Sequence, residues 1–120
     1  MIAMSGAIKK TTGLTGLLVA RNAHYSLTRL YNKILKTLAK MPDESAYKKY
    51  TTETVNERLA IVMKEKDVKA IEDKINCGQI EEVIVQAENE LALSKRIAET
   101  RAWEPLITKP PINQWKWPHV

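Results

Sequence analysis

The side chains best suited to acid–base, nucleophilic or metal chemistry are few and scattered in this 120-residue chain. Neither of the two histidines, His24 and His119, has an acidic residue nearby in the sequence, and both are expected on the surface. Cys77 is the only cysteine, which excludes an intrachain disulfide and a metal site built from cysteines. These patterns predict no catalytic residue and no metal ligand.

Acidic residues are numerous in the last third of the chain, but their spacing is that of a helix surface. General acid–base catalysis needs a carboxylate that is removed from water in a pocket, and the sequence gives no sign of one. The glutamates in question are Glu81, Glu82, Glu88 and Glu90. We expect them to form a solvated face.

The glycines of TTGLTGLL, residues 11–18, do not make a phosphate-binding loop. Such a loop follows a strand and ends in Gly-Lys-Ser/Thr, whereas Lys9 and Lys10 precede these glycines. This segment therefore predicts no nucleotide site, and we expect no small-molecule substrate.

The closing segment WEPLITKPPINQWKWPHV, residues 103–120, contains all three tryptophans and four of the five prolines. In an extended conformation 18 residues span about 55 Å, whereas a 20-residue helix is about 30 Å long, so much of this tail is expected to pass beyond the helices. It either completes the core of its own chain or binds a partner. We expect a partner contact, because Trp is enriched at binding hot spots, with Trp103 remaining on the helices.

Charge divides the chain into two parts. Residues 1–42 contain seven basic side chains and no acid, while the other 78 residues carry 12 basic and 14 acidic side chains. The basic start resembles a mitochondrial targeting segment, and a solvated basic edge is the alternative. No apolar run is long enough to span a membrane. A free-standing basic adaptor for nucleic acid or an anionic membrane surface is the second functional hypothesis.

Helical periodicity accounts for the middle of the chain. An apolar stripe that includes Leu27, Tyr31 and Ile34 predicts a first helix, capped by Asn22 and ending at Met41 before Pro42. The second helix is expected at about 46–65 after Ser45, with Tyr47, Tyr50, Val55, Leu59 and Val62 inward.

The remaining helices follow from caps and breakers. Asp67 can begin a short extra helix or a kink near 66–77, and Gly78 can supply the left-handed conformation that stops it. A last helix is expected at about 79–101. The predicted fold is all-α, a small antiparallel three-helix bundle at 23–102, with an N-terminal arm at 1–22 and an extended C-terminal tail at 103–120.

Four blocks of this sequence resemble one protein family. They are KKTTGLTGLLV at 9–19, YKKYTTETVNERLAIV at 47–62, GQIEEVIVQAENEL at 78–91 and WEP…PP…QWKWP at 103–118. The family is the alpha-subcomplex subunit 5 family, accessory subunits of mitochondrial NADH:ubiquinone oxidoreductase, complex I. The chain departs from the family pattern at Asn22-Ala23, at Lys36 and Lys40, and at Lys66.

The resemblance implies a helical, cofactor-free, non-catalytic protein. It would lie peripherally on the matrix side of the mitochondrial inner membrane. There it would contact core and accessory subunits of the hydrophilic arm of complex I and support assembly and stability, without binding nucleic acid. We expect the two arms to make these contacts, through Trp103, Pro105, Pro110, Pro111, Trp115, Trp117 and Pro118 in the tail and Lys9 and Lys10 in the N-terminal arm.

Overall fold

A computed structural model describes residues 9–118 of the chain, and within that range it contains four helices and no strand. The prediction of an all-α protein is confirmed for these residues. The helices are α1 (Ala23–Leu38), α2 (Ala46–Lys64), α3 (Val68–Ile75) and α4 (Ile80–Thr100). The prediction for His119 lies outside the described residues.

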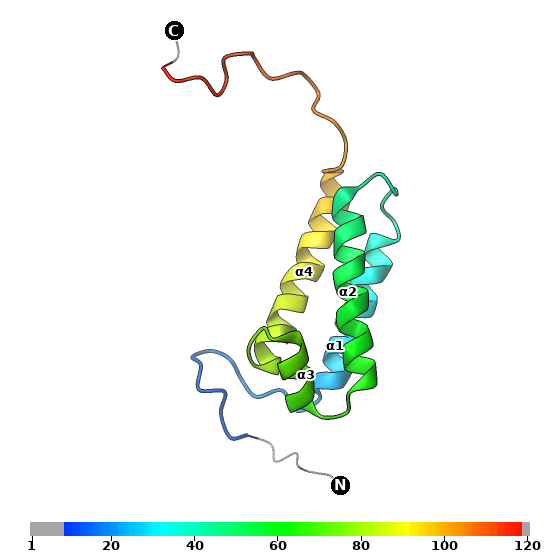
Figure 1. The fold of residues 1–120 in the computed structure, drawn as a ribbon, viewed down its shortest axis with the longest axis vertical. Helices are drawn as coiled ribbons and strands as arrows, with labels where there is room; N and C mark the ends of the chain where they lie inside the picture. Colours follow the sequence, from blue (N-terminus) through cyan, green and yellow to red (C-terminus); the bar gives the residue numbers. More distant parts are fainter. Residues whose placement is uncertain (1–8, 119–120) are drawn as a thin grey trace.

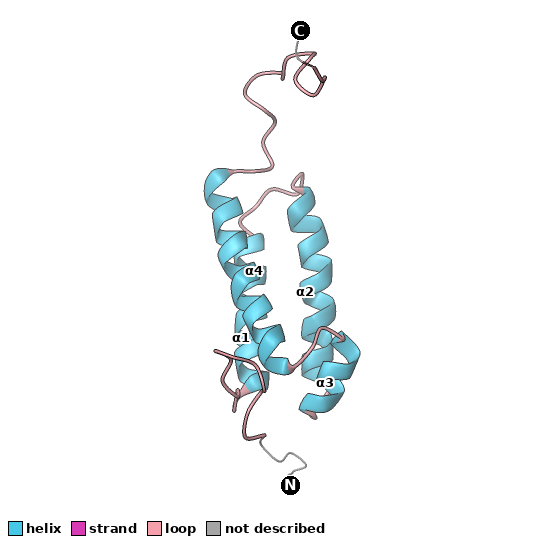
Figure 2. Cartoon of the chain, turned by 90° about the vertical axis from the view of Figure 1, so that its left-hand side faces the viewer, coloured by secondary structure: helices cyan, strands magenta, loops and turns pink. Residues whose placement is uncertain are grey.

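The long helices run alternately up and down, so that α1 and α4 point the same way and α2 the opposite way (Figure 1). Helix α1 packs against both α2 and α4. Helices α2 and α4 both contact α1 but lie apart from each other. Figure 2 shows the space between them. The core is therefore centred on α1, whose Leu27, Ile34 and Leu38 are almost completely buried.

Helix α1 is shorter than predicted, because it ends at Leu38 and not at Met41. The backbone N–H groups of Lys40 and Met41 donate to carbonyls three residues back, so the chain tightens before Pro42. The N-terminal prediction also needs correction. Asn22 occupies the cap position, but its side chain makes no capping hydrogen bond.

Helix α2 begins where its cap predicts, since the Ser45 hydroxyl accepts a hydrogen bond from the backbone N–H of Lys48. Val55 and Val62 are buried as predicted. Tyr50 is 63% exposed, so its predicted inward position is wrong. Tyr50 lies on the face of α2 that is turned toward α4, and the two helices are too far apart there for α4 to cover it.

The short extra helix predicted near 66–77 is α3, whose cap is Asp67, accepting from the backbone N–H of Lys69. Asn76, not Gly78, takes the left-handed conformation directly after the helix, at φ 56°. Gly78 also has a positive φ, 93°, and leads into α4. The predicted stop is correct in place and differs in the residue that makes it.

Two carboxylates accept hydrogen bonds from backbone N–H groups at the start of helix α4. Glu82 accepts from the backbone N–H of Gln79 at 2.8 Å, and Glu72 of α3 accepts from the backbone N–H of Ile80 at 2.6 Å. Both satisfy donors that a helix start leaves free and both complement its dipole. At the other end Arg101 turns left-handed, at φ 55°, and ends the helix.

The two arms leave from opposite ends of the long axis (Figure 1). The described chain measures 68 × 33 × 21 Å along its principal axes. The N-terminal arm lies at the end where α4 begins, and the tail continues beyond the end where α4 stops.

Candidate partner-binding surfaces

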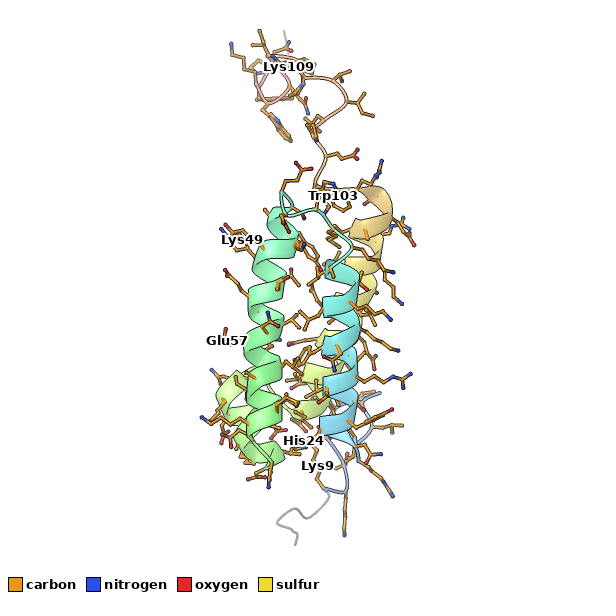
Figure 3. The ribbon with its side chains drawn as sticks, turned by 90° about the vertical axis from the view of Figure 1, so that its right-hand side faces the viewer. Lys9, His24, Lys49, Glu57, Trp103 and Lys109 are labelled. Atoms are coloured by element: carbon orange, nitrogen blue, oxygen red, sulfur yellow. The ribbon has the colours of Figure 1, made fainter. Side chains whose placement is uncertain are left out.

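The described residues bring together no cluster of metal-ligating side chains. No group of three or more His, Cys, Asp or Glu side chains among them is placed to hold a metal ion. His24 lies at the start of α1, where its Nε2 is 2.9 Å from the backbone carbonyl oxygen of Glu65 (Figure 3). The remaining candidates for function are surfaces that can bind other molecules.

The C-terminal tail is the most exposed apolar segment of the described chain. Trp115 is 90% exposed and Trp117 is 86% exposed, and Ile107 and Ile112 are fully exposed. Figure 1 shows the tail running away from the helices, and no other element covers it. An apolar surface of this kind typically marks an interaction site.

The tail is not extended throughout, which refines the prediction. The backbone N–H of Gln114 donates to the Pro111 carbonyl and that of Lys116 donates to the Asn113 carbonyl, both at 3.1 Å. These two turns bend the chain just before and through the Trp115 region. The tail is therefore an irregular arm with its own local structure.

Trp103 behaves differently from the other tryptophans. It is half-buried and packs against the core at the end of α4, as the sequence predicted. Figure 3 places it where the helix gives way to the tail, with Lys109 far out along the tail. Pro105, Pro110 and Pro111 follow it and are exposed, as is Pro118 near the end of the described chain.

The N-terminal arm is held by a small polar network at the start of α4. The Lys9 ammonium donates to Gln79 Oε1 at 2.6 Å and to Glu81 Oε1 at 2.5 Å. Gln79 Nε2 in turn donates to the backbone carbonyl of Thr12 at 2.8 Å. The second carboxylate oxygen of Glu81 accepts from the backbone N–H of Ala20 at 3.0 Å. Three points of the arm, Lys9, Thr12 and Ala20, are thereby tied to one helix end.

Glu81 is 97% buried, so its ionised form needs these partners. Burial on its own would raise the pKa of the Glu81 carboxyl. The hydrogen bonds from Lys9 and from the Ala20 backbone outweigh that effect and hold the pKa below its usual range. The prediction of a solvated acidic face is therefore wrong at Glu81, although Glu88 is exposed.

The two N-terminal lysines predicted to bind a partner differ in their surroundings. The Lys9 ammonium is bonded to Glu81 of the same chain, and the Lys9 side chain is 36% exposed. Lys10 is exposed. Lys10 is thus the one of the two whose side chain is open to a neighbouring molecule.

A basic stripe lies on the outer face of α1 and continues into the turn that follows the helix. Its members, separated by four, three and four residues, are all exposed, which is the spacing of one helix face. Within the described chain none of them has a carboxylate within 4.0 Å. The residues are Arg29, Lys33, Lys36 and Lys40. This surface fits an acidic partner.

Sequence reasoning missed a groove between α2 and α4, which has a volume of about 490 Å³. Tyr31 and Ile34 line the groove on the side of α1. The α2 wall is largely polar, with Thr51, Thr54 and Arg58. These polar residues interrupt the apolar stripe of α2, and that interruption is the signal in the sequence that this face is not closed.

The α4 wall of the groove combines amides with an apolar side chain. Gln86 and Asn89 lie along it, and Leu93 is 46% exposed. Tyr50, on the α2 side, also lines the groove and is the more exposed of the two large side chains. Hydrogen-bonding groups and apolar contacts therefore alternate around the opening.

Two side-chain contacts cross the groove from α2 to α4. The Tyr47 hydroxyl donates to Glu90, and burial together with this hydrogen bond raises the pKa of Tyr47 well above its usual value. Further along, the Arg58 guanidinium donates to Gln86 Oε1 at 3.3 Å and to Cys77 Sγ at 3.4 Å. The groove is thus bridged but not filled.

Tyr31 lines this groove, but its hydroxyl oxygen is buried. Tyr31 is 98% buried, and its hydroxyl has no hydrogen-bond partner among the described residues. Burial raises the pKa of Tyr31, while the neighbouring Arg58 guanidinium acts in the opposite direction through its positive charge and its hydrogen-bonding N–H groups. A buried polar group without a partner costs about 1–3 kcal/mol.

No helix in the described part of the chain combines the length and the apolar character that a bilayer crossing requires.

Comparison with known proteins gives a consistent result. Residues 16–82, more than half of the chain, match the family described as the ETC complex I subunit conserved region. NADH dehydrogenase [ubiquinone] 1 alpha subcomplex subunit 5 of Bos taurus is 51% identical over 115 residues, which are 96% of this chain and 99% of the bovine one.

Two further relatives carry the same name. The subunit 5 of Rattus norvegicus is 50% identical over 115 residues, which are 96% of this chain and 99% of the rat one. The probable subunit 5 of Caenorhabditis elegans is 51% identical over 110 residues, which are 92% of this chain and 73% of the nematode one. The similarity therefore includes the helices and most of both arms.

Proposed function

The chain belongs to the alpha subcomplex subunit 5 family, accessory rather than catalytic subunits of mitochondrial complex I, and on this premise we propose that it supports the assembly and stability of the hydrophilic arm. In this proposal it lies peripherally on the matrix side of the inner membrane. It contributes binding surfaces and no reaction of its own. Its partners are core and accessory subunits of that arm.

One observation carries the proposal, namely the exposure of Trp115 and Trp117 on a tail that leaves the helices. Each Trp side chain buries a large area and loses few rotational degrees of freedom when it binds. We propose that the tail, from Trp103 through Pro105, Pro110 and Pro111 to Pro118, lies on a neighbouring subunit, with Trp103 joining the helices to that contact.

The helices and the N-terminal arm complete this picture. We propose that α1, α2 and α4 act as one three-helix bundle that holds the two arms apart. In the N-terminal arm Lys9 fixes the arm to Glu81, which leaves Lys10 for the partner. Attachment at both ends explains how a small protein can stabilise a larger assembly.

A free-standing basic adaptor is not proposed. The family and the named relatives identify subunits of complex I and give no support to nucleic acid or anionic membrane as the partner. The basic stripe of α1 fits an acidic protein surface within the same assembly.

The test is a double substitution, Trp115→Ala with Trp117→Ala, in cells whose complex I is separated on a native gel. We expect the variant to be incorporated less than the unchanged chain. Because both side chains lie outside the helices, the helical circular dichroism of the purified variant should be unchanged.

The matched control removes exposed apolar surface elsewhere. Tyr25 is 65% exposed on α1 and Met63 is 70% exposed on α2. The pair Tyr25→Ala with Met63→Ala should leave incorporation near normal. Normal incorporation of the double tryptophan variant would refute the role of the tail as an anchor.

A further inference from the structure

The outer face of α1 carries a row of cations that the described chain does not neutralise. None of the four side chains of the basic stripe has a carboxylate of the described chain within 4.0 Å. Several cations elsewhere are paired, since the Lys48 ammonium lies 2.8 Å from Asp43 Oδ1 and the Lys9 ammonium lies 2.5 Å from Glu81 Oε1. Residues 1–42 contain no acid. Nothing in the described chain therefore supplies anions to this surface.

The basic stripe points directly away from the core. At about 100° per residue, Arg29, Lys33 and Lys36 fall within about 60° of the circumference of α1. Ile34 and Leu38 lie on the opposite side of the helix and are almost completely buried. The cations therefore form a narrow, straight and exposed row along the helix.

The spacing of these cations is unfavourable in the free chain. Arg29 and Lys33 are four residues apart and Lys33 and Lys36 are three apart, and like charges at these spacings destabilise a helix. The helix dipole favours cations only in the last turn, where Lys36 lies. Carboxylates placed along the basic stripe would replace this repulsion by attraction.

We propose that the basic stripe binds a helix of a neighbouring protein subunit whose exposed face carries Asp or Glu at intervals of three and four residues. The inference rests on the proposed function, because it takes the neighbour to be another subunit of complex I. It adds a third contact, on the side of the helices, to the contacts of the two arms.

The geometry of the basic stripe fits a helix better than an extended segment or a membrane. Carboxylates on a helix recur at the intervals of the stripe itself, about 4.5 and 6 Å, because both helices rise by about 1.5 Å per residue. Side chains on one face of an extended segment recur about every 6.6 Å and lose register along the row. A surface helix binds lipid by burying its apolar face in the bilayer, whereas the apolar face of α1 is already buried in the core.

The first experiment reverses one charge at the centre of the basic stripe with Lys33→Glu. A tagged variant and the unchanged chain are produced in the same cells, and their ratio in purified complex I is compared with their ratio in the whole mitochondria. The new carboxylate would face the carboxylates of the partner, so we expect the variant to be disfavoured about tenfold.

Two controls separate binding from folding. Lys49→Glu makes the same change of charge at an exposed position of α2, and its ratio should stay near one. The melting temperature of the purified Lys33→Glu chain should be unchanged or higher, because a carboxylate at position 33 has Arg29 and Lys36 four and three residues away on the same helix. A lower melting temperature together with the tenfold loss would assign the effect to folding and overturn the proposal.

The second experiment identifies the partner. A water-soluble carbodiimide joins a lysine amine directly to a carboxylate that touches it, and it adds no spacer. In intact complex I it should join Lys33, Lys36 or Lys40 to Asp or Glu of another subunit, as mass spectrometry of the joined peptides would show. The acids reached from different lysines should be three, four or seven residues apart. Changing the acid joined to Lys33 into Lys should restore incorporation of Lys33→Glu.

A conservative variant tests whether these lysines make the contact themselves. The triple substitution Lys33→Arg, Lys36→Arg and Lys40→Arg keeps every positive charge but removes the amines that the carbodiimide joins. This variant should be incorporated normally and should give no joined peptides from these three positions. Normal incorporation with unchanged joining of the acidic segment would place the contact elsewhere on the chain and overturn the proposal.

Three further outcomes would overturn the inference. They are a Lys33→Glu ratio near one, an equal loss for Lys49→Glu, and acids that are absent from other subunits or lack helical spacing. Absence of any joined acid despite the loss for Lys33→Glu would point to an anionic lipid or nucleic acid. If the unchanged chain did not migrate with complex I at all, the proposed function itself would fail, and the ratio experiment distinguishes the two cases.

Discussion

The ammonium nitrogen of Lys9 lies 2.5 Å from Oε1 of Glu81, a residue 72 positions further along the chain. This contact joins the N-terminal arm to the first turn of α4. The carboxylate is nearly inaccessible to water, whereas the lysine keeps about a third of its exposure. The arm is thus fixed by one buried charge, and three predictions follow from the local chemistry at this end of the molecule.

Replacing Glu81 by Gln removes the charge and keeps the shape. Lys9 and the backbone N–H of Ala20 donate to different oxygens of Glu81, and glutamine has only one acceptor oxygen, so one of these donors would face an NH2 group and the other a neutral oxygen. We therefore expect the free energy of unfolding to fall by about 1.5–3 kcal/mol. Urea denaturation measures this loss. The control is Glu88→Gln, on an exposed position of the same helix, which should change stability by no more than about 0.5 kcal/mol. Equal effects of the two substitutions would contradict the assigned role.

The same carboxyl makes part of the stability depend on pH. Its pKa is lower in the folded chain than in the unfolded one, so its contribution is complete above the ordinary glutamate pKa of about 4.3 and is lost as the pH falls through the folded value. The difference in unfolding free energy between the unchanged chain and Glu81→Gln should be constant from pH 7 to about pH 5 and narrow below it. A difference that stays constant down to pH 3 would refute this prediction.

Gly78 is expected to tolerate no side chain without loss. Its φ of 93° is unfavourable for other residues, at about 1–2 kcal/mol, and a Cβ there would meet the Glu82 carboxylate. Glu82 would have to move and would release the backbone N–H of Gln79. Gly78→Ala should therefore lower the free energy of unfolding through two effects. One is the strained backbone conformation, and the other is the loss of a helix cap worth about 1 kcal/mol.

Gly16→Ala provides the comparison for this substitution. Gly16 also has a positive φ, 77°, but no atom lies within 4 Å of the position that a Cβ would take. In urea denaturation, Gly16→Ala should lower the free energy of unfolding only by the cost of the strained backbone conformation. If Gly16→Ala proved as costly as Gly78→Ala, the contribution of the Glu82 cap would be negligible.

Much of the helical architecture follows from short-range chemistry that the sequence displays. Ser45 and Asp67 mark helix starts because their side chains accept from nearby backbone N–H groups, and both were predicted. The α1 stripe was predictable because a helix with one apolar face has one way to bury it. The start of α1 was predicted correctly, but the capping bond of Asn22 was not formed.

Long-range pairing was not predictable from periodicity. Glu81 has the helix-surface spacing of its neighbours and is buried only because Lys9 and Ala20 reach it from the other end of the chain. Tyr50 fitted an inward stripe and became exposed because α2 and α4 do not close over α1. The groove has the same origin, since it depends on how far two helices stand apart and not on either helix alone.

The placement of the two arms at opposite ends of a 68 Å molecule has a kinetic consequence. A chain that is held at one end keeps its other end close to its binding surface, so a released contact reforms before the whole molecule diffuses away. Effective concentrations for such tethered contacts reach the millimolar range with short linkers. In the proposed attachment through both arms, two individually weak contacts would therefore give a long residence time, and removing either one would shorten that time by far more than half.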